Sequence, residues 1–573
     1  MAEYLSPGVY VEEFDSGPTP MQGVGTSVAG FIGVTERGPI SGAPVLVTGP
    51  ADFKRKFGGY LHESEFGEYR FLAHAVNHFF INGGSKAFVM RVSPSDAVIA
   101  KSQCAEGKEG VIDLQARNPG TWGNSLIVTF KDAIGSKTQI LEDLGNAKYR
   151  LKNATGFAVG DVVAIEGLDE VQYNVVKTTT GNLITFESPF EGNVIDENLL
   201  PKVTIRVCEL DVVIDWEGDL EKYSGASFNA SSPSFIEKVL EKSEMVNLKA
   251  QPSEGAVAPI DVIRQAFGKE GEEIKISFSG GSNGSAPNLT DADFIGTDNG
   301  PGSRTGIQAF LDNTDVNIMA VPGIVSANVQ LSLVAHCEKL GSRFAVLDMP
   351  MNAKTVTDIM AHRDIVDSDY CAMYHPWLQV FDPLDKKDTF IPPSGSIMGI
   401  YARSDNSRGV HKAPANEVVA NCTGLFVNYN VAEQDLLNPK GVNLIRKFPG
   451  SGIRVWGART ASSKPLWKYV NVRRLFIYLE ESIKANTNWV VFEPNDATLW
   501  SRVKRTIELF LEGVWRTGAL VGGSPADAFF VDIGPNTMSK DDIENGRLIC
   551  VIGVAPVKPA EFVIFRITQK TGE

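Results

Sequence analysis

Buried strands that alternate with helix-length segments between residues 316 and 377 constrain the fold more than any other feature of this sequence. Three apolar runs, Val316–Val321, Phe344–Leu347 and Tyr370–Tyr374, have the length of strands and are separated by segments long enough for helices. Strands that alternate with helices pair in parallel through right-handed crossovers. The sequence therefore predicts an α/β unit with a parallel sheet.

The chain of 573 residues is too long for one core and predicts about four domains at roughly 150 residues each. We expect a mixed α/β and α+β protein of several domains. Changes in residue pattern place the divisions at 1–20, 21–103, 104–224, 225–440, 441–556 and 557–573. The first and last of these ranges are predicted to be extended arms.

Helical periodicity fades in residues 104–224, where short β-rich runs alternate with glycine-containing turns. Examples are Leu126–Phe130, Asp161–Ile165 and Leu183–Phe186. Such spacing is typical of all-β folds. We predict an inserted β-sandwich or small barrel.

Two amphipathic helices are predicted in the last third of the chain. The first has an apolar stripe beneath Arg473, Arg474 and Lys484, made of Tyr469, Val472, Phe476, Leu479 and Ile483. The second begins after Asp496, a good N-cap residue. It is predicted to bury Leu499, Val503, Ile507, Phe510 and Val514 and to carry Arg502, Lys504, Arg505 and Arg516.

An alternating strand is predicted at each end of the chain. One lies at Val9–Phe14 among prolines. The other, Glu561–Thr568, places Val563, Phe565 and Ile567 on one face and Phe562 and Ile564 on the other. Because both faces are apolar, we expect this strand to be sandwiched in a sheet, either of a neighbouring subunit or of its own chain.

Catalysis would be expected at the carboxyl ends of the parallel strands. Asp348, His375 and the nearby Cys371 could form a nucleophile system there, but no GxSxG elbow accompanies them. We predict no catalytic residues. A hydrolase-like enzyme built on the α/β unit is the alternative hypothesis.

Other ligand motifs are incomplete. Gly23-Val24-Gly25 lacks the third glycine of a dinucleotide fingerprint, Gly280–Gly284 lacks the ending of a phosphate loop, and both are predicted to be turns. The cluster of Asp382, Asp385 and Asp388 lacks an EF-hand glycine and is predicted to be a solvated loop. No metal and no cofactor are expected.

Charge and cysteine usage suggest the partners and the compartment. Residues 101–330 hold 19 Lys+Arg against 33 Asp+Glu, a net charge of −14, whereas residues 441–520 hold 13 against 6, a net charge of +7. With a pI near 5.1, the basic segment favours a protein partner over nucleic acid. Six dispersed cysteines indicate reduced thiols in a cytoplasm, and we expect neither a secretion signal nor a membrane anchor, which disfavours a cell-surface adhesin.

Long motifs in the order of a known family occur through most of the chain. In the first half they are Ser6–Glu13, Thr26–Gly33, Arg37–Pro39, Asn82–Gly84, Arg91–Val92, Trp122–Asn124 and Val316–Gly323. In the second half they are Tyr374–Trp377, Pro392–Gly395, Arg408–Asn416, Leu437–Asn443, Val455–Thr460, Tyr469–Arg474 and Trp489–Asn495. With these motifs the chain resembles the contractile tail sheath proteins of phages and phage-tail-like injection systems.

The resemblance implies a structural subunit that polymerises in hexameric rings around an inner tube and contracts to drive the tube through a target envelope. Implied partners are other copies of the chain, the inner tube, and baseplate and tail terminator proteins, with assembly in the bacterial cytoplasm, no nucleic acid and no membrane insertion. The family's α/β domain is similar to a subtilisin-like fold without catalysis, residues 21–103 and 441–556 would complete the sheath core, and the 104–224 insertion would face outward.

Two sets of contact residues follow from the same resemblance. Strand exchange with a neighbouring subunit would use Val9, Val11, Phe562, Val563, Ile564, Phe565 and Ile567. The 441–556 domain would face the inner tube, with Arg502, Lys504 and Arg505 as the leading contact candidates.

Overall fold

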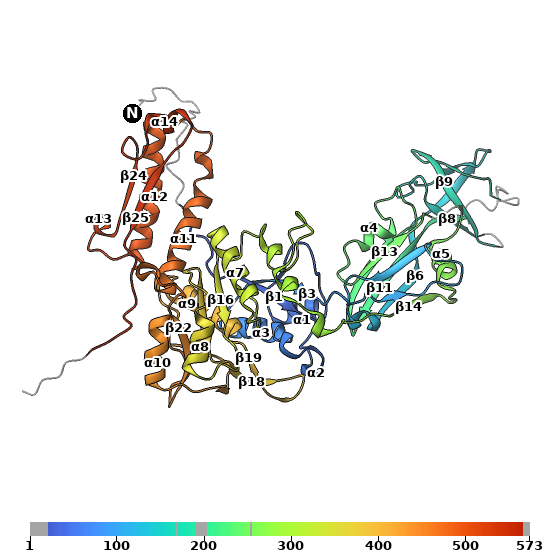
Figure 1. Ribbon diagram of the computed structural model, residues 1–573. Helices are drawn as coiled ribbons and strands as arrows, with labels where there is room; N and C mark the ends of the chain where they lie inside the picture. The colour runs from blue at the N-terminus through green and yellow to red at the C-terminus, as the bar shows by residue number, and fades with distance from the viewer. Residues whose placement is uncertain (1–20, 168–169, 191–202, 253–254, 565–573) are drawn as a thin grey trace, which may run out of the picture.

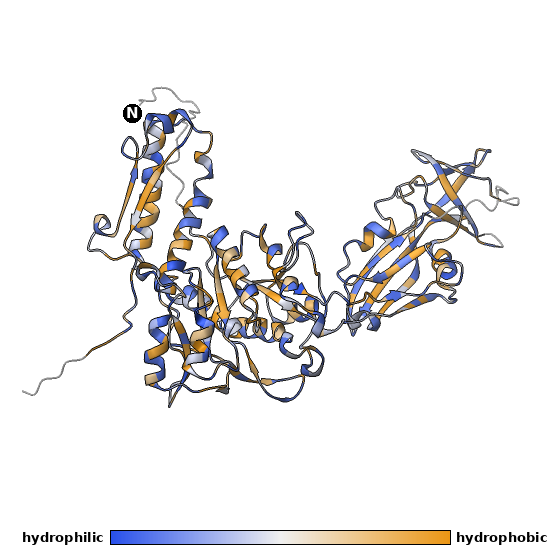
Figure 2. Ribbon diagram, in the orientation of Figure 1, coloured by the Kyte–Doolittle hydropathy of each residue, from blue (hydrophilic) through white to orange (hydrophobic). Residues whose placement is uncertain are grey.

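The computed structural model describes residues 21–167, 170–190, 203–252 and 255–564. Figure 1 shows three parts in a row: a β-rich unit at one end, an α/β unit in the middle and a unit of two long helices at the other end. Apolar residues concentrate along the strands of the central sheet and along the long helices (Figure 2). The predicted N-terminal strand, with Val9 and Val11, lies outside the described residues.

The α/β unit contains a nine-stranded sheet whose six central strands are parallel, as the sequence predicts. Two segments far apart in the chain build it, because β1 pairs with both β3 and β15. In spatial order the strands are β2 (Val45–Val47), β3 (Ala87–Val92), β1 (Ala29–Val34), β15 (Ile318–Ala320), β16 (Phe344–Asp348), β17 (Cys371–His375), β22 (Val442–Phe448), β23 (Gly452–Val455) and β20 (Glu417–Val418).

Helices cover both faces of this sheet. Buried side chains of one core come from α1 (Pro50–Phe57), α3 (Leu72–Ile81) and α9 (Ser394–Arg408). Those of the other core come from α2 (Glu63–Phe66), α6 (Asp291–Ile295), α7 (Ala327–Leu340), α8 (Val356–Arg363) and α10 (Val431–Leu437). A small sheet of β18 (Leu378–Asp382), β19 (Lys387–Ile391) and β21 (Gly424–Leu425) completes the unit.

The β-rich unit is built on two long strands that pair along most of their length, β6 (Leu126–Asp143) and β11 (Thr204–Trp216). At their outer ends they close a ring of six strands with β7 (Lys148–Leu151), β8 (Val162–Glu166), β9 (Gln172–Thr180) and β10 (Leu183–Phe186). This ring is a small barrel, one of the two forms that the sequence predicts. Its core includes Tyr149, Phe186 and Phe190.

At their inner ends the same two strands continue into an open antiparallel layer covered by α4 (Ile236–Leu240) and α5 (Pro259–Phe267). The layer adds β4 (Lys101–Ser102), β5 (Ile112–Ala116), β12 (Asp219–Ala226), β13 (Val246–Ala250) and β14 (Glu273–Ser279). The sequence boundary at residue 224 therefore cuts through this sheet. Strands β13 and β14 were not assigned to this unit because their partner strands lie more than 120 residues earlier in the chain.

The helical unit contains α11 (Val470–Asn486) and α12 (Ala497–Arg516), followed by α13 (Pro525–Ala528), β24 (Phe529–Ile533), α14 (Lys540–Glu544) and β25 (Cys550–Val554). The Asp496 side chain accepts a hydrogen bond from the Leu499 amide at 2.8 Å, so the predicted N-cap is confirmed. All five predicted apolar positions of α12 are buried.

The predicted stripe of α11 is only partly correct. Val472 and Leu479 are buried, but Phe476 and Ile483 are only half-buried, while Leu475 and Ile477 are buried instead. The reason is that α11 lies between two cores: Val470 and Ile477 join the α/β core, and Leu475 and Leu479 join the core shared with α12. A helix buried on two sides has no single stripe.

Candidate assembly surface

Strands β24 and β25 form an antiparallel pair in register from Phe529 opposite Val554 to Ile533 opposite Cys550. Within the part of the chain that the structure describes, no third strand joins this pair. Unpaired backbone N–H and C=O groups along a strand edge are a template for another strand. The pair therefore has two edges at which strands of other chains can add.

One face of this two-stranded sheet is anchored and the other is exposed. Val531 is buried against the core of α11 and α12, and Ile552 packs beside it. On the opposite face the Phe530 side chain, 58% exposed, covers Gly553, where an added Cβ would meet the ring at 2.1 Å. The anchored face holds the sheet on α12 while its outer face and edges remain accessible.

The C-terminal segment leaves this unit as an exposed apolar tail. Phe562, Val563 and Ile564 are 73%, 68% and 79% exposed. They form no strand ladder in the structure, and Phe565 and Ile567 lie outside the described residues. Three consecutive exposed apolar residues cost solvation free energy in an isolated subunit. The preceding residue, Glu561, is fixed by Arg459.

The segment at the other end of the chain, residues 21–27, is bound along α11. Backbone and side-chain groups of Gln22 and Asn486 hydrogen-bond at 3.3 and 2.9 Å, and the Val24 amide donates to Ser482 Oγ at 3.1 Å. Gly23 is needed here because a Cβ would lie 2.1 Å from the Tyr478 hydroxyl. The predicted turn at Gly23-Val24-Gly25 is wrong, because these residues form no turn and lie along α11 instead.

A groove of about 630 Å³ lies beside residues 21–27. Its walls come from the end of α9, the loop that follows it, the first half of α11 and the second half of α12. The exposed Leu509 and the buried Phe510 both line it, together with His411 of the loop. The groove adjoins the point at which the undescribed residues 1–20 begin.

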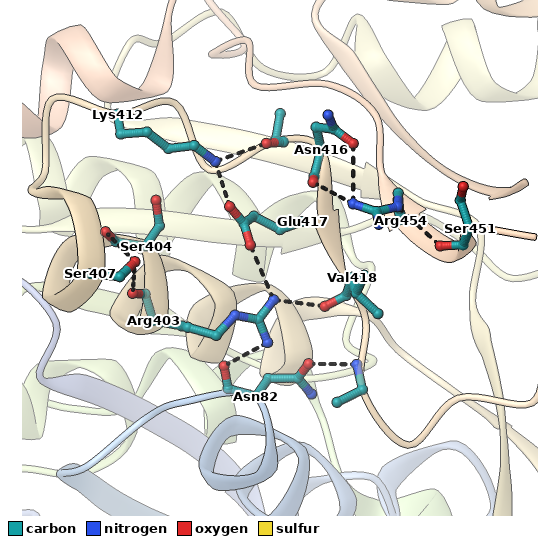
Figure 3. Close-up of polar contacts among 12 residues, drawn as sticks. Asn82, Arg403, Ser404, Ser407, Lys412, Asn416, Glu417, Val418, Ser451 and Arg454 are labelled. Carbon is teal, nitrogen blue, oxygen red and sulfur yellow. Dashed lines mark hydrogen bonds and ion pairs between the residues drawn. The ribbon is translucent and has the colours of Figure 1, made fainter.

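The loop that carries His411 belongs to the Arg408–Asn416 motif, and a polar network holds it in place (Figure 3). Glu417 accepts hydrogen bonds from Lys412 at 2.5 Å and from Arg403 of α9 at 3.4 Å. Asn416 has a φ of 57°, a left-handed conformation, and its carbonyl accepts from Arg454 at 2.9 Å. The motif thus has a structural role at this edge of the sheet.

Two arginines that the sequence places on an outer face of α11 are buried ion pairs instead. Arg474 donates to both carboxylate oxygens of Asp405 at 2.9 and 2.6 Å, and Arg473 pairs with Asp369. Their partners lie at the end of α9 and just before β17. These pairs fix the helical unit to the α/β unit.

The predicted inner-tube candidates do not share one face of α12. Arg502 and Arg505 are exposed and three residues apart, which places them side by side on a helix. Arg502 lies 4.8 Å above the Trp489 ring. Lys504 points elsewhere, with its ammonium 3.9 Å from Glu508.

The carboxyl ends of the parallel strands hold the buried side chains of Asp348 and His375, whereas the buried Cys371 lies at the start of β17. Asp348 accepts hydrogen bonds from the Ser394 amide and hydroxyl and from the Gly323 amide, and burial raises its pKa to about 6. Burial lowers the pKa of His375 to about 4 and raises that of the Cys371 thiol, so neither residue is poised for nucleophilic chemistry.

A buried Ser–His contact was not predicted from the sequence. Ser396 Oγ lies 3.2 Å from His78 Nδ1, but Ser396 is fully buried and His78 is 2% exposed. Only the adjacency of α3 and α9 brings these residues together, so no sequence signal marks them. Because both side chains are buried, the pair contributes to the packing of α3 against α9.

The aspartate cluster is not a uniformly solvated loop. Asp382 is 1% exposed and lies 3.5 Å from the buried His74, which corrects the expectation for this residue. Asp385 pairs with His62, and Asp388 accepts a hydrogen bond from Gln379.

Among the described residues no group of three or more His, Cys, Asp or Glu side chains is arranged to hold a metal ion. No helix in this part of the chain is long and apolar enough to cross a membrane.

Comparison with known proteins identifies the class. Residues 299–461 match the family model of the phage tail sheath protein central domain, and residues 462–570 match that of the phage tail sheath C-terminal domain. The tail sheath protein of Escherichia phage P2 is 26% identical over 295 residues, which cover 49% of this chain and 72% of that protein. That of Burkholderia phage BcepMu is 26% identical over 49% of this chain and 61% of its own length.

A solved structure shares the fold over the whole chain. The sheath of the PVC extracellular contractile injection system, in its contracted state, aligns over 100% of this chain and 99% of its own with a TM-score of 0.52 and 20% identity. The fold and the matched domains are those of contractile tail structural proteins. The chain belongs to the phage tail sheath family, which includes the sheaths of phage-tail-like injection systems.

Proposed function

We propose that this chain polymerises in hexameric rings as a helical sheath around an inner tube and contracts to drive the tube through a target envelope. The observation that carries the proposal is the unfinished β24–β25 sheet, together with residues 21–27 bound along α11 and the exposed apolar residues Phe562–Ile564. Subunits joined by such non-reciprocal contacts build open helical assemblies. No observation favours the hydrolase alternative.

The proposed lattice contact is strand exchange. Val9 and Val11 at one end, and Phe562, Val563, Ile564, Phe565 and Ile567 at the other, would add to the edges of a neighbour's β24–β25 pair. About five backbone hydrogen bonds at ~1 kcal/mol each and three buried side chains at ~1.5–3 kcal/mol each would oppose ordering costs of ~1–2 kcal/mol per residue over about eight residues. The net free energy gained from one exchanged strand is therefore close to zero. Two exchanged strands per subunit would hold the lattice together.

The remaining parts of the proposal assign each unit a direction. The helical unit would face the inner tube through the exposed Arg502 and Arg505, with Lys504 at the side of this surface. The acidic β-rich unit would face outward, and the central unit would be a non-catalytic relative of the subtilisin fold. Baseplate and tail terminator proteins would cap the sheath, which would assemble in the bacterial cytoplasm.

Contraction on this proposal needs no nucleotide. The free energy would be stored at assembly in a kinetically trapped extended state and released as subunits reach better packed contacts. The buried pairs Arg473–Asp369 and Arg474–Asp405 support a subunit in which the helical and α/β units move together.

Electron microscopy of the purified full-length chain tests the assembly. We expect rings or tubes without the inner tube, in the contracted form. Uniform monomers by sedimentation at high concentration, with no tubes in the micrographs, would contradict the proposal.

A further inference from the structure

A polar clamp holds the chain at Glu561, directly before the exposed tail. Arg459 donates from Nε to one carboxylate oxygen at 2.7 Å and from Nη2 to the other at 2.6 Å. Asn438 Nδ2 donates to Glu561 at 2.7 Å, and the Tyr469 hydroxyl donates at 3.1 Å. Four hydrogen bonds therefore fix one side chain.

The three clamp partners come from separate segments that meet only in the fold. Asn438 follows α10, Arg459 follows β23, and Tyr469 precedes α11. All three lie in sequence motifs that the strand-exchange proposal does not use. Their convergence places the clamp on the α/β unit, at its junction with the helical unit.

Arg459 is itself rigidly held. Its side chain is 6% exposed, its amide donates to Asn443 Oδ1 at 2.7 Å, and its Nη1 donates to the Asn438 carbonyl at 3.0 Å. Burial opposes ionisation of Glu561, but the hydrogen bonds from Arg459 and Asn438 outweigh it and hold the pKa below its usual value. A bidentate charged pair of this kind is strong and directional.

The chain just before the clamp is held much less firmly. The Val557 amide donates to the Ala519 carbonyl at 3.1 Å, and Asn471 donates to the Val557 carbonyl at 3.2 Å. Without Glu561, a pull on the tail would load these contacts and then peel β25 from β24. With Glu561 bound, the force on the tail is transmitted to Arg459 of the α/β unit and does not reach β25.

We propose that Asn438, Arg459 and Tyr469 clamp Glu561 so that tension on the C-terminal arm is borne by the α/β unit and the β24–β25 sheet is spared. The inference rests on the proposed strand exchange, because tension on the arm arises only if the arm is bound to a neighbour. Glu561 acts here as a positioning residue for the arm.

The test compares the full-length chain with Glu561→Gln, which keeps the size of the side chain but removes its charge. Glu544→Gln is the matched control, because Glu544 is exposed and distant from the clamp in sequence. In the free subunit we expect amide hydrogen exchange at residues 557–564 to rise about tenfold in Glu561→Gln, with the melting temperature of the core unchanged. In assembled tubes we expect subunits to be released about tenfold faster, because losing one partner of a hydrogen-bonded charge pair acts mainly on dissociation.

A double-mutant cycle separates the clamp from a general loss of structure. Arg459→Gln should raise the same exchange, and Glu561→Gln in that background should add little, because the two residues act as one contact. Wild-type exchange and wild-type subunit release in Glu561→Gln would overturn the clamp.

A truncation after Glu561 distinguishes failure of the clamp from failure of the proposed function. If the truncated chain builds normal tubes, strand exchange is wrong and the clamp bears no load. If the truncation abolishes tubes while Glu561→Gln tubes match the wild type, strand exchange stands and the clamp alone is overturned.

Discussion

The two ends of this molecule differ in whether their strand edges are paired. In the β-rich unit, pairing of β6 with β11 closes a ring of six strands, so the small barrel has no free edge. In the helical unit, β24 and β25 pair only with each other within the described residues. A closed ring is complete as a monomer, whereas a two-stranded sheet gains stability when a strand is added. The open layer of the β-rich unit also ends in two edge strands, β12 and β13. For the strand exchange that we propose, the comparison favours the two-stranded sheet at the helical end.

The two ends also differ in charge. The range 101–330, which includes the barrel, has a net charge of −14. The helical unit, residues 470–564, holds 10 Lys+Arg against 12 Asp+Glu, a net charge of −2, because most of the +7 of residues 441–520 comes from 441–469 in the α/β unit. The β-rich end is strongly acidic and the helical end is nearly neutral, so a basic contact at the helical end depends on local groups such as the exposed Arg502 and Arg505. Three experiments test this difference between the two ends.

Deletion of residues 562–573, which leaves the contacts of Glu561 in place, should have the largest effect. We expect tube formation to be abolished while the monomer's melting temperature changes by less than about 2 °C, because Phe562–Ile564 contribute exposed side chains to the isolated chain. Thermal unfolding and electron microscopy of the same preparation measure both. A lower melting temperature would show that the arm pairs within its own subunit, and normal tubes would refute strand exchange.

Reversal of charge on α12 should have an intermediate effect. We expect Arg502→Glu with Arg505→Glu to prevent an extended sheath from forming on the inner tube while sheath-only tubes remain, because the two residues share an exposed face. The contact should weaken with added salt. Co-assembly with the inner tube, scored by electron microscopy, measures the effect.

Two single variants serve as controls for the charge reversal. Lys504→Glu should be nearly silent, because this side chain points toward Glu508 and away from the arginine pair. Arg516→Glu, beyond the arginine pair and already bound to Glu512, should also leave co-assembly intact. Wild-type co-assembly by the double variant would exclude Arg502 and Arg505 as tube contacts.

Acidification should have the smallest effect and should spare both ends. The seven histidines lie between His62 and His411, with none in residues 101–330 or 441–573. Burial lowers the pKa of His78 to about 4 and that of His336 to about 3, so the unfolded chain binds more protons between pH 6.5 and those values. Stability therefore falls as the pH falls through this window, by about 1–2 kcal/mol per histidine at pH 5.

Hydrogen exchange at pH 7 and pH 5, corrected for intrinsic rates, checks this prediction unit by unit. Protection should fall in the α/β unit and hold in the small barrel. His78→Gln should reduce the difference between the two pH values. Equal loss of protection in the barrel would show that the pH response is not set by these histidines.

Much of the local structure follows from sequence pattern. The parallel strands β15, β16 and β17, the N-cap at Asp496 and the buried positions of α12 were all predicted within one to three residues. Each of these depends on neighbours in the chain: a short apolar run, a capping side chain, a period of 3.6 residues. The stripe of α11 failed because burial on two sides removes the period that the prediction needs.

Contacts between distant segments could not be predicted in the same way. Nothing in the local sequence links Glu561 to Arg459, 102 residues earlier, or Arg474 to Asp405, 69 residues earlier. Arginines in a helix are ordinarily predicted to be exposed, and only a buried carboxylate partner reverses that expectation. The inserted unit's boundary failed for a related reason, since β13 joins the sheet through β5, and β14 joins it through β4 and β6, all of them far earlier in the chain.

The family, the order of the elements and the apolar character of the two chain ends were predictable from the sequence, because motifs and periodicity are properties of neighbouring residues. Only the tertiary structure shows which strand edges are paired with another strand and which are left unpaired. Closure of the barrel depends on β6 meeting β11, and the open pair depends on β24 and β25 finding no third strand among the described residues. Edge pairing is a contact between segments far apart in the chain, so its outcome is set by the fold as a whole.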